Sequence, residues 1–476
     1  MKEPIKRSID PLTVFTFLWA CQALVHQEFY NGWIGEGNPW GWGLTGVALA
    51  TLFFPRSIVL FSMMLLTSII YNVLQWPFVV NHILVETLFN AVLLTAVGWS
   101  MLQRNGDGRA AIIDRSAPVL CVSMIVMYYF AILAKLNAGF FDANQSCVVV
   151  MFDDLVRRFP LIPNNALTHN LAIGGTIIVE LAIPVLLTFK RTQWIAVLLG
   201  LGFHVMLGLI GHRTFSGLAF AVYALFLLPG ITGVVNDLRN WLESKVGART
   251  LGFARIALRV VAAMVALLIV GAEWAGRYRD ALGPVKIYQI PWLIWILWSL
   301  AVALLYCFSV KRYSSVATSG PDLPSHYRPG FLWLLVPLVF LNGSSQYLGF
   351  KTETCFTMYS NLRTEGGVNN HFFMPALRLA NYQDDLVQIT ETDYSLLQKN
   401  YLDKEMYITA FEFQRILSNA TEDLNVRFVF REEQQEINIK AGVPNEHPLC
   451  AYQNPFLAKI LTFRPVPQSN GSPCQH

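Results

Sequence analysis

Charged residues are scarce in this 476-residue sequence, where Asp, Glu, Lys and Arg together make up 14%. An average soluble protein carries about 25%. Because hydrophobic residues make up 54%, a set of ordinary soluble domains is excluded. The formal net charge is only +4 and no block rich in Lys or Arg is present, so we expect no nucleic-acid partner.

Several signatures of familiar enzymes are also missing. The sequence contains no GxxxxGK[ST], HExxH, CxxC or GxSxG motif. These motifs cradle nucleotide phosphates, hold catalytic zinc, carry out thiol redox chemistry or present a nucleophilic serine. The corresponding enzyme classes therefore have no support, and we expect no metal.

Long apolar runs instead predict a polytopic α-helical membrane protein. A bilayer span needs about 20 residues, and the apolar segments lie near residues 12–29, 43–54, 57–75, 80–102, 117–134, 171–189, 194–211, 216–235, 260–275, 288–309 and 331–345. Since segment 43–54 is short and Pro337 and Asn342 interrupt the last one, we expect about 9–11 spans. No clear small-residue cleavage site follows the first segment, so we interpret it as an uncleaved helix rather than a signal peptide.

The Lys and Arg residues orient these segments. With the N-terminus in the cytoplasm, seventeen Lys and Arg residues fall on the inner side and only six in the outer loops between the apolar segments, as the positive-inside rule requires. An odd number of spans then places the tail from about residue 346 outside. We expect an integral membrane protein, in a bacterial inner membrane rather than the endoplasmic reticulum.

The predicted outer side carries four cysteines, Cys147, Cys355, Cys450 and Cys474. They allow one or two disulfides in an oxidising compartment, and the sequence does not choose among the three pairings. The tail predicts a small extracytoplasmic α+β domain, with an amphipathic helix at 399–419 and strands at 425–430 and 436–440. The resulting domains are a transmembrane domain at 8–235, additional transmembrane helices at 236–345 and the outer domain at 346–476.

The fourth apolar segment carries a polar stripe formed by His82, Glu86 and Asn90, with Asn81 beside it. A spacing of four places these side chains on one helix face. Ionisable groups within a membrane usually face a cavity or the bundle interior, which favours a functional site. The alternative is hydrogen bonding that only joins helices. For Gln22 and His26 of the first segment we expect packing or interfacial placement.

Three further ionisable residues lie in or beside apolar segments. Lys135 closes the fifth segment; it is either an interfacial lysine or a general base whose pKa is lowered by burial. Glu180 lies in the middle of a predicted helix. His204 lies among Gly200, Gly202 and Gly208, a pattern typical of close helix packing, although a membrane histidine can also bind haem.

Three motifs in this region carry a resemblance to a known family. They are Asn81-His82, the aromatic helix Tyr128–Asn137 (YYFAILAKLN), and Phe203–Leu227, which begins with Phe-His. Over roughly residues 8–235 the chain resembles the vitamin K-dependent γ-glutamyl carboxylase family and the related bacterial HTTM (horizontally transferred transmembrane) proteins. The outer segment Tyr347–Asn370 is similar to a stretch in bacterial HTTM-type proteins.

The resemblance implies a quinol-dependent reaction. In the family a lysine, here Lys135, deprotonates a reduced naphthoquinone, which reacts with O2 to give an epoxide and a strong base. That base removes a γ-proton from a peptide glutamate, and CO2 adds to the carbanion. Asn81 and His82 would support the carbanion or CO2 step. His204, Glu86 and Glu180 would bind the quinol.

The implied partners are the lipid bilayer and a secreted or membrane peptide. The family's aspartate after Lys-Leu is Asn137 here, and Ala134 replaces a lysine that often precedes the catalytic one.

Two alternatives stay open. One is a non-catalytic membrane scaffold or quinone-binding module whose outer domain binds a protein; the other is a b-type haem protein using His82 and His204.

Overall fold

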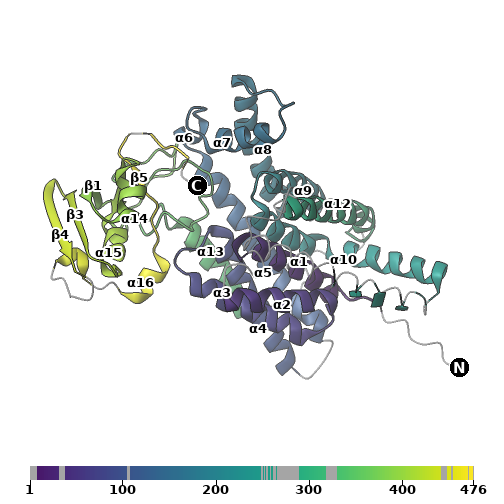
Figure 1. Ribbon diagram of the computed structural model, residues 1–476. Coiled ribbons are helices and arrows are strands. Elements are labelled where there is room, and N and C mark those ends of the chain that lie inside the picture. Colours follow the sequence, from purple (N-terminus) through teal and green to yellow (C-terminus); the bar gives the residue numbers. More distant parts are fainter. Residues whose placement is uncertain are drawn as a thin grey trace, which may run out of the picture. The chain divides into compact units, whose positions relative to one another are not determined.

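The computed structural model describes residues 8–31, 38–103, 108–247, 289–317, 330–440, 447–451, 454–469 and 471–474, with a few single positions between 250 and 264. Helices dominate these residues, and a small strand domain lies near the C-terminus (Figure 1). The helices before that domain are α1 (Pro11–Asn31), α2 (Pro39–Phe53), α3 (Ile58–Gln75), α4 (Asn81–Leu102), α5 (Gly108–Lys135), α6 (Ala138–Phe141), α7 (Cys147–Arg158), α8 (Ala166–Thr188), α9 (Gln193–Leu209), α10 (Arg213–Val246), α12 (Gln289–Ala317), the 3₁₀ turn η1 (Phe331–Leu334) and α13 (Leu335–Ser344).

Among the described residues, six helices are long and apolar enough to cross a membrane. They are α3, α4, α5, α8, α10 and the part of α12 at Leu293–Arg312. Two shorter apolar helical stretches, Gln193–Leu209 and Phe331–Ser344, accompany them. The predicted segment at 260–275 falls almost entirely outside the described residues. The helical class and the apolar helices expected from composition are therefore present.

The chain divides into two compact units that interleave along the sequence. The first contains residues 1–74, 85–125 and 182–336, and the second contains residues 75–84, 126–181 and 337–476. Helices α4, α5 and α8 each contribute residues to both units.

The core of the first unit is built around α10, which packs against α1, α9 and α12. Almost every residue of α10 from 214 to 231 is buried, as expected for a helix that is apolar on all sides. A Cβ atom at Gly200 would collide with Tyr223, and one at Gly208 would collide with Trp295. These two glycines have the predicted packing role, whereas Gly202 has open space.

The second unit contains the strand domain. Its five-stranded antiparallel sheet has the order β4-β3-β1-β2-β5, and its core includes Val387, Phe413 and Phe428. The elements of this domain are β1 (Leu386–Thr392), α14 (Ser395–Leu397), the π-helical turn η2 (Gln398–Leu402), β2 (Met406–Thr409), α15 (Ala410–Ser418), β3 (Leu424–Phe430), β4 (Glu433–Ile439), η3 (Pro448–Cys450), α16 (Pro455–Ile460) and β5 (Val466–Pro467).

The prediction for this domain was partly right. Strands β3 and β4 lie where the two strands were expected. The single helix expected at 399–419 is wrong, because β2 pairs with β1 and separates the π-helical turn η2 from α15. Thr409 ends the strand and starts α15 as its N-cap, where its side chain accepts the Glu412 amide; this satisfies an otherwise unpaired helix donor.

One disulfide joins the first residue of α7 to the C-terminal tail, Cys147 to Cys474. Cys355 and Cys450 are free thiols. The structure therefore selects one of the pairs that the sequence left open. The two cysteines are 327 residues apart, so their bond closes a very long loop.

We expect Cys474→Ser to lower the free energy of unfolding by about 2–5 kcal/mol, because the bond restricts the unfolded chain. The measurement is thermal or denaturant unfolding in detergent without reductant. Cys450→Ser, which removes a free and half-buried thiol, is the matched control and should change little. Equal effects of the two substitutions would show that the disulfide does not stabilise the fold.

Candidate functional site

Lys135, the last residue of α5, is buried rather than interfacial. Only 4% of the residue is exposed, and its Nζ lies 2.9 Å from Oε2 of Glu180 on α8. Nζ also donates to the carbonyl of Ala131 at 3.3 Å. Because Glu180 Oε2 has no hydrogen bond of good geometry among the described residues, the two side chains form an ion pair rather than an aligned hydrogen bond. The structure thus joins two residues that the sequence had singled out separately.

Asn137 fixes the chain immediately after Lys135. Its Oδ1 accepts the Phe140 amide at 2.9 Å and caps α6, while its Nδ2 donates to the carbonyls of Ala134 at 2.7 Å and Ser360 at 2.6 Å. An aspartate has no N–H to donate to these two carbonyls. Asparagine at position 137 therefore has a structural use in this chain.

Asn81, at the start of α4, is also buried and bonded to a distant loop. Its Oδ1 accepts the backbone N–H of Phe356 at 2.6 Å, and 5% of the residue is exposed. His82 is half-buried in the same turn of α4. Asn81, His82, Lys135 and Glu180 all belong to the second unit.

The loop that Asn81 binds has unusual backbone geometry. Thr354, Phe356, Tyr359 and Asn361 all have positive φ values, between 51° and 66°. Non-glycine residues adopt this conformation at a cost, and such residues gather at functional sites. The segment from Tyr347 to Asn370, singled out by resemblance alone, is thus a strained and mostly buried loop.

His371 closes this loop against the end of α5. Its ring Nε2 lies 2.8 Å from the carbonyl of Leu133, and its backbone forms a bridge with Asn137. Burial lowers the pKa of His371, although the Leu133 carbonyl acts in the opposite direction. The loop and the Lys135 end of α5 are therefore parts of one packed structure.

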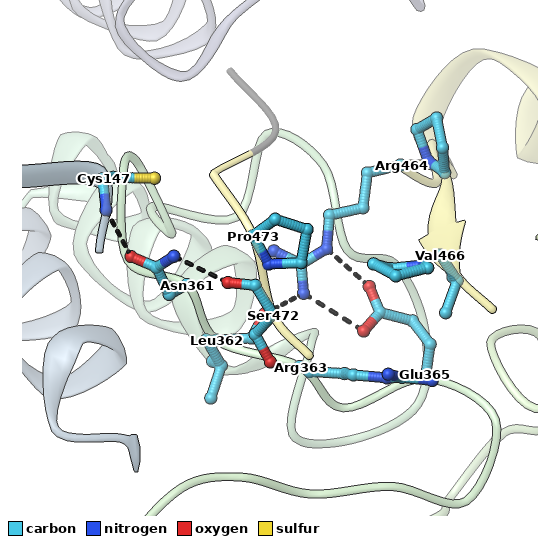
Figure 2. Close-up of a pocket in the computed structure, with 11 residues that line it drawn as sticks. Cys147, Asn361, Leu362, Arg363, Glu365, Arg464, Val466, Ser472 and Pro473 are labelled. Atoms are coloured by element: carbon cyan, nitrogen blue, oxygen red, sulfur yellow. Dashed lines mark hydrogen bonds and ion pairs between the residues drawn. The ribbon is translucent and has the colours of Figure 1, made fainter. Parts of the chain in front are cut away.

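A pocket lies along the same loop, lined by Asn361, Arg363, Glu365, Arg464 and the disulfide residue Cys147, among others (Figure 2). Arg464 and Glu365 form a buried, two-pronged ion pair with distances of 2.7 and 3.1 Å. Burial alone would raise the pKa of Glu365, but the Arg464 guanidinium and its hydrogen bonds lower it overall. The sequence did not predict this pair, because the two residues are distant in the chain and form no local motif.

Glu86 belongs to the first unit, where it joins three helices. Its Oε2 accepts Gln22 Nε2 of α1 at 2.8 Å and lies 2.7 Å from His26 Nδ1, and its Oε1 accepts Ser68 Oγ of α3 at 3.0 Å. The residue is 1% exposed. Gln22 and His26, for which we expected packing or interfacial placement, thus join α1 to α4 through Glu86.

Asn90 continues the network one turn further along α4. Its Oδ1 accepts Trp19 Nε1 at 2.8 Å, and its Nδ2 donates to Ser68 Oγ at 2.9 Å. An indole N–H can only donate, so Asn90 must face Trp19 with its oxygen and Ser68 with its N–H group. Because Ser68 accepts that bond, its own hydroxyl hydrogen is donated to Glu86. Glu86 and Asn90 of the predicted stripe act together here, while His82 belongs to the other unit.

His204 is fully buried in the first unit. Its ring contacts those of Phe203, Phe215 and Tyr223, and its Nδ1 lies 3.5 Å from Ser216 Oγ. Within the described part of the chain, no group of three or more His, Cys, Asp or Glu side chains is arranged to hold a metal. The quinol-binding role of His204 and Glu86 stays a prediction.

Comparisons of this chain with protein-family models, with curated proteins and with solved structures gave no match.

Proposed function

We propose that this chain is an integral membrane enzyme of the carboxylase type, in which quinol oxygenation drives carboxylation, or a related reaction, of a peptide. The observation that carries the proposal is the buried Lys135–Glu180 pair. Buried lysines serve as general bases in enzymes, and the contact with Glu180 holds the Lys135 amine in one position.

In this proposal, Lys135 Nζ removes a hydroxyl proton from the quinol and Glu180 holds the lysine in place. A reduced naphthoquinone supplies, on reaction with O2, the strong base that carboxylation needs. Asn81 positions His82 from the start of α4, where it binds Phe356 of the strained loop, and His82 supports the carbanion or CO2 step.

The membrane arrangement belongs to the same proposal. About 9–11 spans carry the chain across a bacterial inner membrane, with the N-terminus in the cytoplasm and the strand domain outside. The Cys147–Cys474 disulfide supports an outer location for both of its ends, since structural disulfides persist in oxidising compartments. A secreted or membrane peptide is the proposed substrate.

The test is direct assay of the purified protein in lipid nanodiscs with reduced naphthoquinone and O2. We expect the naphthoquinone epoxide, detected by chromatography and mass spectrometry, and its yield should be unchanged in Lys399→Met, which removes an exposed lysine of the strand domain. If the wild-type protein forms no epoxide above the rate in empty nanodiscs, the enzymatic proposal is wrong. The non-catalytic membrane module is then the better interpretation.

A further inference from the structure

A short apolar segment of the second unit lies exposed at its surface. Residues 372–379 read FFMPALRL and contain one charged residue, Arg378, which pairs with Asp384 at 2.9 Å. Four large apolar side chains of this segment are more than half exposed, those of Phe372, Phe373, Leu377 and Leu379. Clustered apolar side chains at a surface mark sites of contact with proteins or membranes.

Both ends of the segment are hydrogen-bonded beside the ends of apolar helices. The Phe372 N–H donates to the carbonyl of Leu136 at 3.1 Å, one residue beyond the end of α5. The N–H groups of Leu379 and Ala380 donate to the carbonyl of Leu348 at 3.1 and 3.2 Å, four residues beyond the end of α13. The segment is therefore held beside one helix that is long enough to cross a membrane and one shorter apolar helix.

A further exposed aromatic side chain extends this surface. Phe141, the last residue of α6, is 44% exposed, and its ring centroid lies 5.6 Å from that of Phe372. Helix α6 starts directly after the end of α5, so Phe141 comes from the same end of that helix. We refer to Phe141 and residues 372–379 together as the apolar rim.

Neighbouring side chains satisfy much of the backbone at the start of the segment. His371 Nδ1 accepts the N–H groups of Phe373 and Met374 at 3.2 and 2.9 Å. Asn369 Nδ2 donates to the Met374 carbonyl at 2.7 Å, and Pro375 has no N–H. Because unpaired backbone groups are costly in an apolar environment, this bonding lowers the cost of bringing the segment into contact with lipid.

The irregular backbone limits the depth that the segment can reach. No helix or strand covers residues 372–379, and lipid-exposed irregular loops do not occur within the hydrocarbon core of a bilayer. Apolar side chains can instead enter the boundary between headgroups and acyl chains, to a depth of about 5–10 Å. That boundary suits a segment with apolar side chains and one charged residue that already has a partner.

We propose that the apolar rim inserts into the headgroup boundary of the lipid bilayer and anchors the second unit there. Lipid is the occupant that the structure favours, because the apolar rim continues an exposed apolar surface. Leu338, Phe340 and Leu341 of α13 are also more than half exposed, and a bilayer around α13 would cover them as well. This inference rests on the membrane arrangement proposed above and not on the reaction.

The experiment is photolabelling of the purified full chain in lipid nanodiscs. One phospholipid carries a diazirine near its headgroup and another carries it in the middle of an acyl chain, and mass spectrometry of the digested protein locates the labelled residues. We expect the first lipid to label the apolar rim. Helix α8 is the reference, because its exposed Leu171 and Ile178 should be labelled if it spans the bilayer.

The reference separates this proposal from the membrane arrangement. Labelling of α8 without labelling of the apolar rim would overturn the proposal and leave the arrangement standing, and the apolar rim would then be a contact surface for a protein. If neither is labelled, the membrane arrangement and the anchor are both wrong. A labelled apolar rim in a protein that forms no epoxide would refute the reaction alone.

Phe373→Glu is the test variant, because it places a charge within the apolar rim. It should lower labelling of the apolar rim about tenfold or more, the factor that corresponds to losing the burial of one Phe side chain. Labelling of α8 should not change, which shows that the variant is folded. Leu379→Glu, at the most exposed of these side chains, is a second variant with the same expected result.

Leu396→Glu is the matched control. Leu396 is an apolar residue of α14 in the strand domain and is 40% exposed, so its replacement adds the same charge outside the apolar rim. Labelling of the apolar rim should then equal that of wild type. If Phe373→Glu and Leu379→Glu were also labelled like wild type, these side chains would not enter the lipid and the proposal would be wrong.

Discussion

Lys135→Met is expected to lower epoxide formation about 10²- to 10⁴-fold, the range that a positioned general base contributes. It should also destabilise the fold by about 3–5 kcal/mol, because it leaves the Glu180 carboxylate buried without its cation. Epoxide yield and unfolding in detergent measure the two effects separately. The side chains of the pair are 5% and 12% exposed, so solvent screens this loss little.

A second substitution distinguishes catalysis from packing. Lys135→Met combined with Glu180→Leu removes both charges and should recover most of the lost stability, because an apolar pair often replaces a buried ion pair without cost. Epoxide formation should stay low in this double variant. Recovery of activity together with stability would show that Lys135 is structural and is not the base.

Arg464→Met is expected to have the largest effect on the stability of the second unit, about 3–5 kcal/mol, because Glu365 is left buried and unpaired. Glu365 is 0% exposed and accepts two bonds from Arg464. Arg464 also donates to the carbonyl of Leu362 in the strained loop. The substitution should therefore disturb the loop as well, and denaturant unfolding measures the change.

Arg427→Met is the matched control for this experiment. Arg427 also pairs with two glutamates, Glu391 and Glu436, but all three side chains are exposed. Exposed ion pairs contribute little to stability, so we expect a small change. If Arg427→Met lowered the free energy of unfolding as much as Arg464→Met, burial would not explain the stabilising effect of the Arg464–Glu365 pair.

The Arg464–Glu365 pair also predicts a pH dependence. The pKa of Glu365 lies below its ordinary value of 4.5 in the folded protein, so folding favours the ionised carboxylate. Its contribution to stability is then fully present above the ordinary value and is lost as the pH falls through the lowered value. The stability difference between wild type and Arg464→Met should narrow over that acidic range.

Local patterns in the sequence predicted much of the fold. Scarce charge and long apolar runs indicated the helices of α3, α4, α5, α8, α10 and α12, because apolarity over some 20 residues is a local property. The tail's sequence also predicted strands where β3 and β4 lie. The same reasoning failed at residues 406–409, where the pairing of β2 with β1 outweighed helical periodicity, because strand formation depends on a partner elsewhere in the chain.

The candidate site, like the fold, was predicted only in part from the sequence. Lys135, Glu180 and Asn81 were found from the sequence because an ionisable or polar residue is conspicuous in an apolar segment. The pairing of Lys135 with Glu180 was not found, because the two residues are distant in the sequence. Glu365 and Arg464 were not found either, because polar residues in a tail of mixed composition have no distinctive local pattern.

By itself, the sequence determined the helical class, the position of the apolar segments and the few polar residues that interrupt them. Only the tertiary structure decided that Lys135 pairs with Glu180, that Asn81 binds Phe356 and that Cys147 bonds to Cys474. The reason is physical: apolarity and periodicity act over neighbouring residues, whereas a buried charge or thiol takes its partner from whichever distant segment the folded backbone brings beside it.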